Sequence, residues 1–447
     1  MSDFIAQAAR FAAVNLGDDN NTPWLADVNR AGLDRWSSLA FPTRKTEDWK
    51  YTPLKSLENE NYFTFAEPQS NDENHELMTL CQIPDLDGLK LVFVNGYFCA
   101  DLSSANISID LPELTITTFS KADHVQKKSI TEHLNTIAPQ EKHEFAALNT
   151  SCLSEGVFIR VAKNQRIAQP IHIVSVTTAQ ASAFMVNQRA LIVLESGSQA
   201  TVVEHFVSSL EKQTSFVNSV SEIIVGDNAH LQHYRIHEED ESALHIGGTH
   251  VELGKSANID SFHLALGSEI KRNDIVVHHK GEGAHCELNG VYLPRKKQHV
   301  DFHTCIEHAV PHCTTNEVFR GIIADSARAV FNGRIHIHKY AQKTFAQLSN
   351  KNLLTSNKAE IDTKPELEIY ADDVQCAHGA TVAQLDTESL HYFKTRGIGT
   401  EEAMVMLSFG FINELINNVK NEAVGDYLRP KLAELFAKAP ELARPAP

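Results

Sequence analysis

The chain has 447 residues, of which 42% are hydrophobic and 22% charged, and its formal net charge is −17 at pH 7. This length exceeds one ordinary hydrophobic core and predicts two or three domains of roughly 150 residues each. The negative charge opposes binding to nucleic acid and to anionic membranes, except at local basic patches. No apolar run approaches the roughly 20 residues of a membrane span, and the N-terminus lacks the pattern of a signal peptide. We therefore expect a cytoplasmic protein.

The cysteines give no sign of disulfides or of a zinc knuckle. There are seven, and no two are spaced as Cys-x-x-Cys. They stand at positions 81, 99, 152, 286, 305, 313 and 376. Dispersed cysteines are typical of a reducing compartment, where most pack as small buried apolar side chains.

Residues 1–150 predict a mixed helical and β domain. An apolar stripe from Phe4 to Leu16 indicates an amphipathic helix. The segment Leu89–Phe98 predicts a strand that enters a hairpin turn at Asn95-Gly96. Residues 129–152 again have a helical pattern. The candidate core residues of that stretch are Leu134, Ile137, Phe145 and Leu148.

The segment Phe41–Leu54 is dense in aromatic and charged residues and contains two prolines. One interpretation is a surface turn that Trp49 and Tyr51 attach to the domain. The other is an interface, since aromatic-rich loops also form contacts between proteins. The composition leaves both interpretations open.

From Gly156 to Val382, short apolar strands alternate with a repeated corner motif, Gly-polar-polar-Ala. The first glycines of its copies are 29, 28 and 27 residues apart. The copies begin at Gly197, Gly226, Gly254 and Gly281, and degenerate copies begin at Ala324 and Ser356. Such a period is typical of stacked coils, in which the glycine permits a positive φ and the alanine points inward.

We therefore predict a mainly β chain whose core, residues 151–385, is a right-handed parallel β-helix (β-solenoid) between helical N-terminal and C-terminal regions. Alternating patches such as Thr201–Phe206 and Arg334–His338 fit strands with one buried face. A twisted β-sandwich is the competing architecture, but it does not need a constant spacing of one corner motif.

Residues 386–447 predict a C-terminal helical domain. Thr400 is the expected cap of a helix whose first turn holds Glu401 and Glu402. One apolar stripe of this helix is Met404, Leu407, Phe411 and Leu415, and a second is Met406, Phe409, Ile412 and Ile416. Either one stripe covers the end of the solenoid and the other docks a second protein, or both pack within the chain against a helix over 426–438.

Two short patterns suggest chemistry that their surroundings do not support. Gly254–Ser256 resembles part of a phosphate loop, but the required first glycine would fall at Thr249 and a strand follows. Asp372-Asp373 is a close acidic pair, as a polysaccharide lyase or hydrolase would need, but adjacent corner aspartates usually form turns. We expect neither a nucleotide site nor a carbohydrate-cleaving site.

Potential metal ligands are concentrated in the segment 303–313. They are His303, Cys305, His308, His312 and Cys313, with His278, His279, His285, Cys286, His336 and His338 elsewhere in the strands. Stacked coils bring such side chains within about 5 Å of neighbouring strands, so a metal cage can form. No spacing matches a known zinc pattern. Exposed histidines, or histidines hydrogen-bonded within the solenoid, are the alternative.

Cys376 and His378 form a thiol–imidazole pair on one face of a strand, because they are two residues apart. The plain alternative is a buried cysteine and a hydrogen-bonded histidine. The acidic strand and corner before them would raise the pKa of the thiol and attract a cation. An iron–sulfur cluster typically needs four thiolate or imidazole ligands, so this pair could complete a set only with another chain.

Three motifs resemble the SufB/SufD family of iron–sulfur cluster assembly proteins. They are Phe41–Leu54 (FPTRKTEDWKYTPL), Arg328–Gly333 (RAVFNG) and Thr363–Thr381 (TKPELEIYADDVQCAHGAT). The last is long and specific, although SufB shares part of it, and the first favours the SufD branch. The likeness extends from about residue 36 to residue 420.

The resemblance implies a non-catalytic scaffold that pairs with SufB through the β-helix and binds the ATPase SufC through its C-terminal helices. Sulfur would arrive indirectly from SufE-type or SufU-type donors, and a homodimer could form without SufB. His378 first and Cys376 second would contribute to a transient cluster at the SufB interface, with no permanently bound cofactor. Reduced flavin is associated with the assembled complex, but no residue here is assigned to it.

Two other hypotheses remain at this point. One is a self-contained metal-binding β-solenoid enzyme that uses the 303–313 cluster. The other is a purely structural solenoid.

Overall fold

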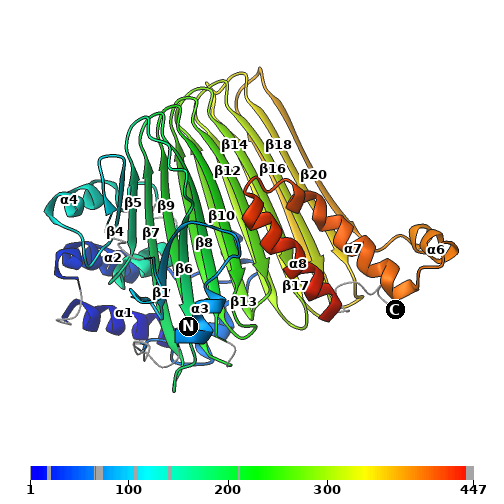
Figure 1. Cartoon of the computed structure of the whole chain (residues 1–447), viewed down its shortest axis with the longest axis horizontal. Coiled ribbons are helices and arrows are strands. Elements are labelled where there is room, and N and C mark those ends of the chain that lie inside the picture. Colours follow the sequence, from blue (N-terminus) through cyan, green and yellow to red (C-terminus); the bar gives the residue numbers. More distant parts are fainter. Residues whose placement is uncertain are drawn as a thin grey trace.

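The computed structural model describes residues 2–17, 22–64, 66, 74–104, 109–138, 143–209 and 212–438. In this part of the chain, the backbone coils back and forth between two ten-stranded sheets to form a β-solenoid, with helices toward both termini of the chain (Figure 1). The predicted fold class is confirmed. Residues 439–447 of the predicted C-terminal domain lie outside the described residues.

The sheets are named here sheet A and sheet B, and each is given in its spatial order. Sheet A is β2 (Tyr97–Phe98), β1 (Leu89–Val94), β6 (Ile171–Thr177), β8 (Gln199–Ser208), β10 (His230–Glu238), β12 (Asn258–Leu266), β14 (His285–Leu293), β16 (Thr314–Ile323), β18 (Phe345–Leu354) and β20 (Gln375–Ala383). Sheet B is β19 (Glu360–Ile369), β17 (Arg328–Ile337), β15 (His299–His308), β13 (Ile270–His279), β11 (Leu244–Leu253), β9 (Ser215–Val225), β7 (Phe184–Leu194), β5 (Val157–Val161), β4 (Leu114–Thr118) and β3 (Ile109–Asp110).

Along the chain, helices occur both before and after the main run of solenoid strands. Before it lie α1 (Ser2–Gly17), α2 (Ala26–Ser38), α3 (Asn74–Leu80), α4 (His124–His133) and α5 (Glu144–Ser151), with short 3-10 helices η1 (Pro23–Leu25), η2 (Glu47–Trp49) and η3 (Leu54–Glu58). After it lie α6 (Thr387–Thr395), α7 (Thr400–Asn417) and α8 (Glu422–Lys438). Among the described residues, no helix combines the length and apolar character needed to cross a membrane.

From β6 to β20, successive strands alternate between the sheets and pair in parallel with the strands one coil away. Side chains therefore alternate between the interior and the outer face. In β15, Val300, Phe302 and Ile306 join the interior core, whereas His303 and Cys305 lie on the outer face. Because the register between neighbouring strands is regular, equivalent residues of successive coils lie next to one another along the solenoid.

The structure of the corners confirms that the alanines of the repeated motif point inward, and it shows that the role predicted for most of the glycines was wrong. Ala229, Ala257 and Ala284 are fully buried in the interior. The positive φ, however, usually falls two residues after the first glycine, for example at Asn228. At Gly254 a Cβ atom would lie 2.6 Å from Asp227 Oδ1 in the preceding corner. Glycine is needed there because neighbouring coils approach closely, not because of a positive φ.

Most of the N-terminal helices lie against the outer face of sheet B, whereas Leu77 of α3 packs against strands β1, β6 and β8 of sheet A. Phe145 of α5 packs with Trp49 and with Phe216 of β9 in one buried apolar cluster. Trp49 is buried and carries the Arg272 guanidinium 3.8 Å from its ring centroid, whereas Tyr51 is exposed. Trp49 thus attaches the segment Phe41–Leu54 directly to the solenoid, and Tyr51 does not take part.

The C-terminal helices α7 and α8 lie against the outer face of sheet A. Ile412 and Ile416 of α7 and Leu428 of α8 pack in one cluster with Tyr234 of β10 and Phe262 of β12. Figure 1 shows α8 running across the strands of sheet A. Of the two alternatives for this helix, the one in which a stripe covers the end of the solenoid is therefore wrong, because α7 lies on the face of sheet A and contacts α8. Thr400 is also not the N-cap, because it is the first helical residue. The N-cap is Gly399, so no side chain caps the start of this helix.

The two ends of the solenoid differ. At the N-terminal end, the predicted hairpin at Asn95-Gly96 joins β1 to β2, and β3 pairs antiparallel with β4. At the C-terminal end, β19 and β20 each pair with only one strand among the described residues. Every residue of β19 is at least partly exposed, and most of β20 is exposed. We call this the open end.

Candidate functional site

Cys376 and His378 lie on β20, the last strand of sheet A, at the open end. In the ladder with β18, Cys376 stands beside Ala346 and His378 beside Leu348. Ala346 and Leu348 are buried interior residues, so Cys376 and His378 belong to the interior face of the last coil. The sequence predicted one shared face, and the structure identifies it as the inner one.

The two side chains differ in exposure. Cys376 is half-buried against the interior core, and burial raises the pKa of its thiol. The sequence also predicted a raised pKa for this thiol, but the cause is burial rather than the acidic strand. His378 is exposed, because no further coil covers it. Neither residue belongs to a group of three potential metal ligands within the described part of the chain. The pair is therefore an incomplete ligand set.

The acidic corner before β20 has a structural role. Asp372 and Asp373 are exposed, and the Asp373 carboxylate pairs with the Lys343 ammonium group of the previous coil. The Asp373 N–H donates a hydrogen bond to Gln342 Oε1 at 2.8 Å. These contacts fit the turn-forming role and leave no free carboxylate pair for acid–base chemistry.

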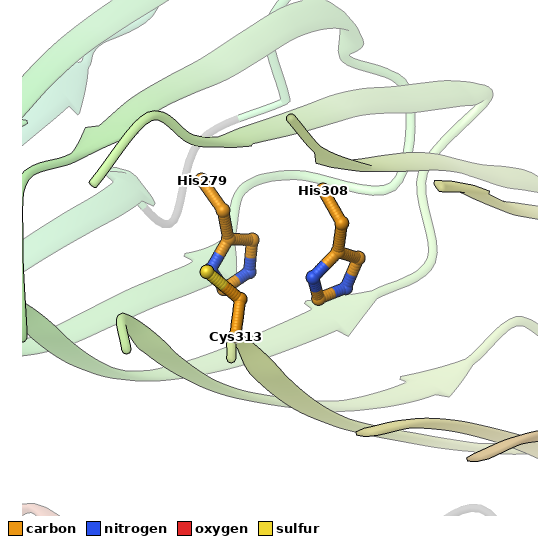
Figure 2. Close-up of side chains that lie close together, drawn as sticks. All are labelled: His279, His308 and Cys313. Atoms are coloured by element: carbon orange, nitrogen blue, oxygen red, sulfur yellow. The ribbon is translucent and has the colours of Figure 1, made fainter. Parts of the chain in front are cut away.

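The five potential ligands of the segment 303–313 do not meet. His303 and Cys305 face outward from β15, and His312 is exposed at a corner. His308 and Cys313 are buried in the interior, where His279 of β13 joins them (Figure 2). The structure thus splits the predicted cluster and forms a different one.

An outer groove of about 590 Å³ lies between η2, α5 and the outer face of sheet B. Its lining combines Arg272, Arg334 and Lys364 with several carboxylates, and the guanidinium of Arg334 donates to Cys305 Sγ at 3.2 Å. Lys364 pairs with Glu47 of η2 at 2.7 Å. Sequence reasoning missed this groove, because its residues come from separate strands and from the segment Phe41–Leu54.

The solenoid interior also holds buried charges. Glu204 accepts hydrogen bonds from Arg235 at 2.9 Å and from Ser221 at 2.6 Å, and its other oxygen lies 2.9 Å from His233. Burial alone would raise the pKa of Glu204, but Arg235 and His233 together hold it below its usual value. Glu317 has no cationic partner among the described residues, and burial raises its pKa to about 7.

Comparisons with known proteins agree over most of the chain. Residues 176–411 match the family model described as "SUF system FeS cluster assembly, SufBD core domain", and residues 13–173 match "SufBD protein N-terminal region". The iron–sulfur cluster assembly protein SufD of Escherichia coli is 32% identical over 404 residues, which cover 90% of this chain and 91% of that protein.

Two proteins of Bacillus subtilis are also similar. Its iron–sulfur cluster assembly protein SufD is 26% identical over 90% of this chain and 91% of its own length. Its iron–sulfur cluster assembly protein SufB is 23% identical over 89% of this chain and 82% of its own length. With its two matching domains and its solenoid, this chain belongs to the SufBD family of iron–sulfur cluster assembly proteins and is of the SufD type.

Proposed function

We propose that the chain is a non-catalytic scaffold subunit of a SufBCD-type complex, in which its open end pairs with SufB and His378 and Cys376 contribute to a nascent cluster. The observation that carries this proposal is an incomplete ligand pair on the inner face of a strand whose outer edge has no partner within the described chain.

The geometry of the open end supports this pairing. A strand added beside β20 would lie about 4.8 Å away and would place its own inward side chains next to His378 and Cys376. A cluster typically needs four ligands, and the partner would supply the others. Large apolar side chains are exposed at this end: Ile369 at 41%, Tyr370 at 62% and Val382 at 48%. Such side chains at an unpaired edge favour a protein partner.

The C-terminal helices support a second partner, the ATPase SufC. α7 buries one side against sheet A and leaves Met406 46% exposed, while Tyr392 of α6 is 57% exposed. In Figure 1, α6 and the adjoining end of α7 project beyond the sheets. The chain has no nucleotide-binding motif of its own, so ATP hydrolysis would belong to SufC. SufE-type or SufU-type donors would act through SufB, and the complex would work in the cytoplasm.

A mutational experiment tests the proposal. The chain is co-expressed with SufB and SufC, and iron and acid-labile sulfide are measured in the purified complex. We expect His378→Ala to lower the cluster content by at least about tenfold, because one ligand is lost. The same complex should still assemble. The matched control is His124→Ala, which changes an exposed histidine at the other end of the solenoid.

A normal cluster content in the His378→Ala complex would refute the site. If the chain fails to bind SufB at all, the scaffold role itself is wrong and a homodimer or a purely structural solenoid becomes the better explanation.

A further inference from the structure

Three groups of potential metal ligands occur among the described residues, and none of them includes Cys376 or His378. They are His279, His308 and Cys313; His237, Glu239 and His245; and Glu307, His336 and His338. Within each group, one possible ligand atom per residue lies within 4.8 Å of the others. The scaffold role uses none of them.

The first group is enclosed in the solenoid interior. His279 of β13 and His308 of β15 are ladder partners, and their rings stack with centroids 4.3 Å apart. Cys313 lies in the corner that leads into β16, and its sulfur lies against the His279 ring in Figure 2. All three side chains are buried. Two adjacent coils therefore bring together two imidazoles and a thiol.

The hydrogen bonds around this group leave one nitrogen of each ring without a partner. The Nε2 atoms of His279 and His308 both lie 3.1 Å from the Thr315 hydroxyl oxygen. Both Nδ1 atoms are buried and make no hydrogen bond in the described structure. The backbone of Ala284 also lies beside the His279 ring, and its carbonyl accepts from the Thr314 N–H at 3.0 Å.

This pattern matches the requirements of metal ligands. The Thr315 oxygen can accept from both Nε2–H groups, and both Nδ1 lone pairs are then available. A histidine that binds metal normally donates its other ring N–H to a nearby acceptor, which fixes the tautomer. A buried polar atom without a partner is costly, so two such atoms in one place call for a missing ligand.

We propose that His279 Nδ1, His308 Nδ1 and the Cys313 thiolate bind a divalent transition-metal ion of the zinc class. The ion clips two adjacent coils together in the solenoid interior, and water fills the fourth position. Two imidazoles and one thiolate suit a borderline-soft ion such as Zn²⁺. This inference does not rest on the scaffold role or on the open end.

The other two groups are weaker candidates because a positively charged side chain already lies beside the carboxylate of each group. In the second group, the Lys271 ammonium donates to Glu239 at 2.7 Å and neutralises the only carboxylate. In the third group, Arg334 lies 3.9 Å from Glu307, and the group is partly exposed. A positive charge at ligand distance opposes a metal ion.

Binding requires a small local movement. Ligand atoms around tetrahedral zinc are roughly 3.3 to 3.6 Å apart, which follows from bonds of about 2.05 Å to nitrogen and 2.3 Å to sulfur. The stacked rings must tilt toward each other to reach that spacing.

The test uses the full chain after removal of metal with a chelator. Co²⁺ and Zn²⁺ are titrated in competition with a chelator of known affinity. We expect one tight equivalent per chain and, with Co²⁺, a thiolate-to-cobalt charge-transfer band. Cys313→Ser should abolish the band, and Cys313→Ser and His308→Asn should each weaken binding at least about 100-fold. His312→Ala and Cys376→Ser are the matched controls and should retain the band.

A missing band in the wild-type chain, or a band that persists in Cys313→Ser, would overturn the proposal. Thermal unfolding without metal checks that the variants fold. If they do not fold, alkylation of the wild-type chain decides: Zn²⁺ should protect Cys313 at least about tenfold but not Cys99, which lies outside the group. Equal modification with and without Zn²⁺ would then refute the site.

Discussion

The two ends of the solenoid are built from the same kind of coil but are finished differently. At the N-terminal end, each sheet ends in a short antiparallel strand, and residues such as Ile116 of β4 are almost fully buried. At the C-terminal end, β19 and β20 keep an unpaired edge in the described chain, and the helices α7 and α8 cover a lateral face instead. The open end is the one at which we propose that a partner joins the chain.

We expect the largest effect on stability where the N-terminal helices cover sheet B. Glu222 of β9 pairs with Arg189 at 2.5 Å, and both are buried. Glu222 also accepts from the backbone N–H of Asn135 at 2.9 Å. We expect Glu222→Ala to lower the free energy of unfolding by about 3–5 kcal/mol, because Arg189 would lose its charged partner while buried between sheet B and the N-terminal region.

Urea unfolding of the isolated chain measures this effect. The control is Glu241→Ala, which breaks the partly exposed pair with Arg295. It should cost no more than about 1 kcal/mol. Equal losses in the two variants would contradict the importance of burial at the covered part.

The second prediction compares the same substitution, isoleucine to alanine, at the two ends of the solenoid. Ile116→Ala should cost about 2–5 kcal/mol, since Ile116 is 1% exposed in the interior core. Ile369→Ala, at a residue that is 41% exposed on β19, should change the stability of the isolated chain by less than about 0.5 kcal/mol. Ile369→Ala should instead weaken binding to SufB. Similar losses of stability in both variants would remove the distinction between the ends.

Much of this contrast follows from the sequence, and part of it does not. The spacing of the corner alanines predicts coils, and Asn95-Gly96 predicts the hairpin, because both depend on local residues. The inner position of His378 depends on the ladder between β18 and β20, and strand parity cannot be followed through the corner before it. The meeting of His279 with His308 likewise depends on coil register, which no local pattern sets.

The third prediction concerns pH. Burial raises the pKa of Glu317 to about 7, above its value near 4.5 in the unfolded chain. The folded state therefore binds the extra proton, and its stability from this group is full below pH 4.5 and is lost as the pH rises through 7. We expect a loss of about 3 kcal/mol over that range. Glu317→Gln should remove this loss in urea unfolding at pH 5 and pH 8. An unchanged pH dependence in the variant would contradict the assignment.

The smallest effect is expected at the candidate site itself. Cys376→Ser should change the stability of the isolated chain by about 0.5 kcal/mol or less, because the side chain is half-buried at an open edge. The same variant should lower the cluster content of the complex with SufB and SufC. A large loss of stability in the isolated chain would favour the alternative of a buried structural cysteine.

The most direct test of the open end is site-specific photo-crosslinking in the co-expressed complex. Tyr97 of β2 and Val382 of β20 lie on the two end strands of sheet A and have similar exposures, 43% and 48%. With a photoreactive residue at either position, we predict crosslinks to SufB from position 382 and none from position 97. Crosslinks from position 97 alone would place the partner at the wrong end and contradict the account.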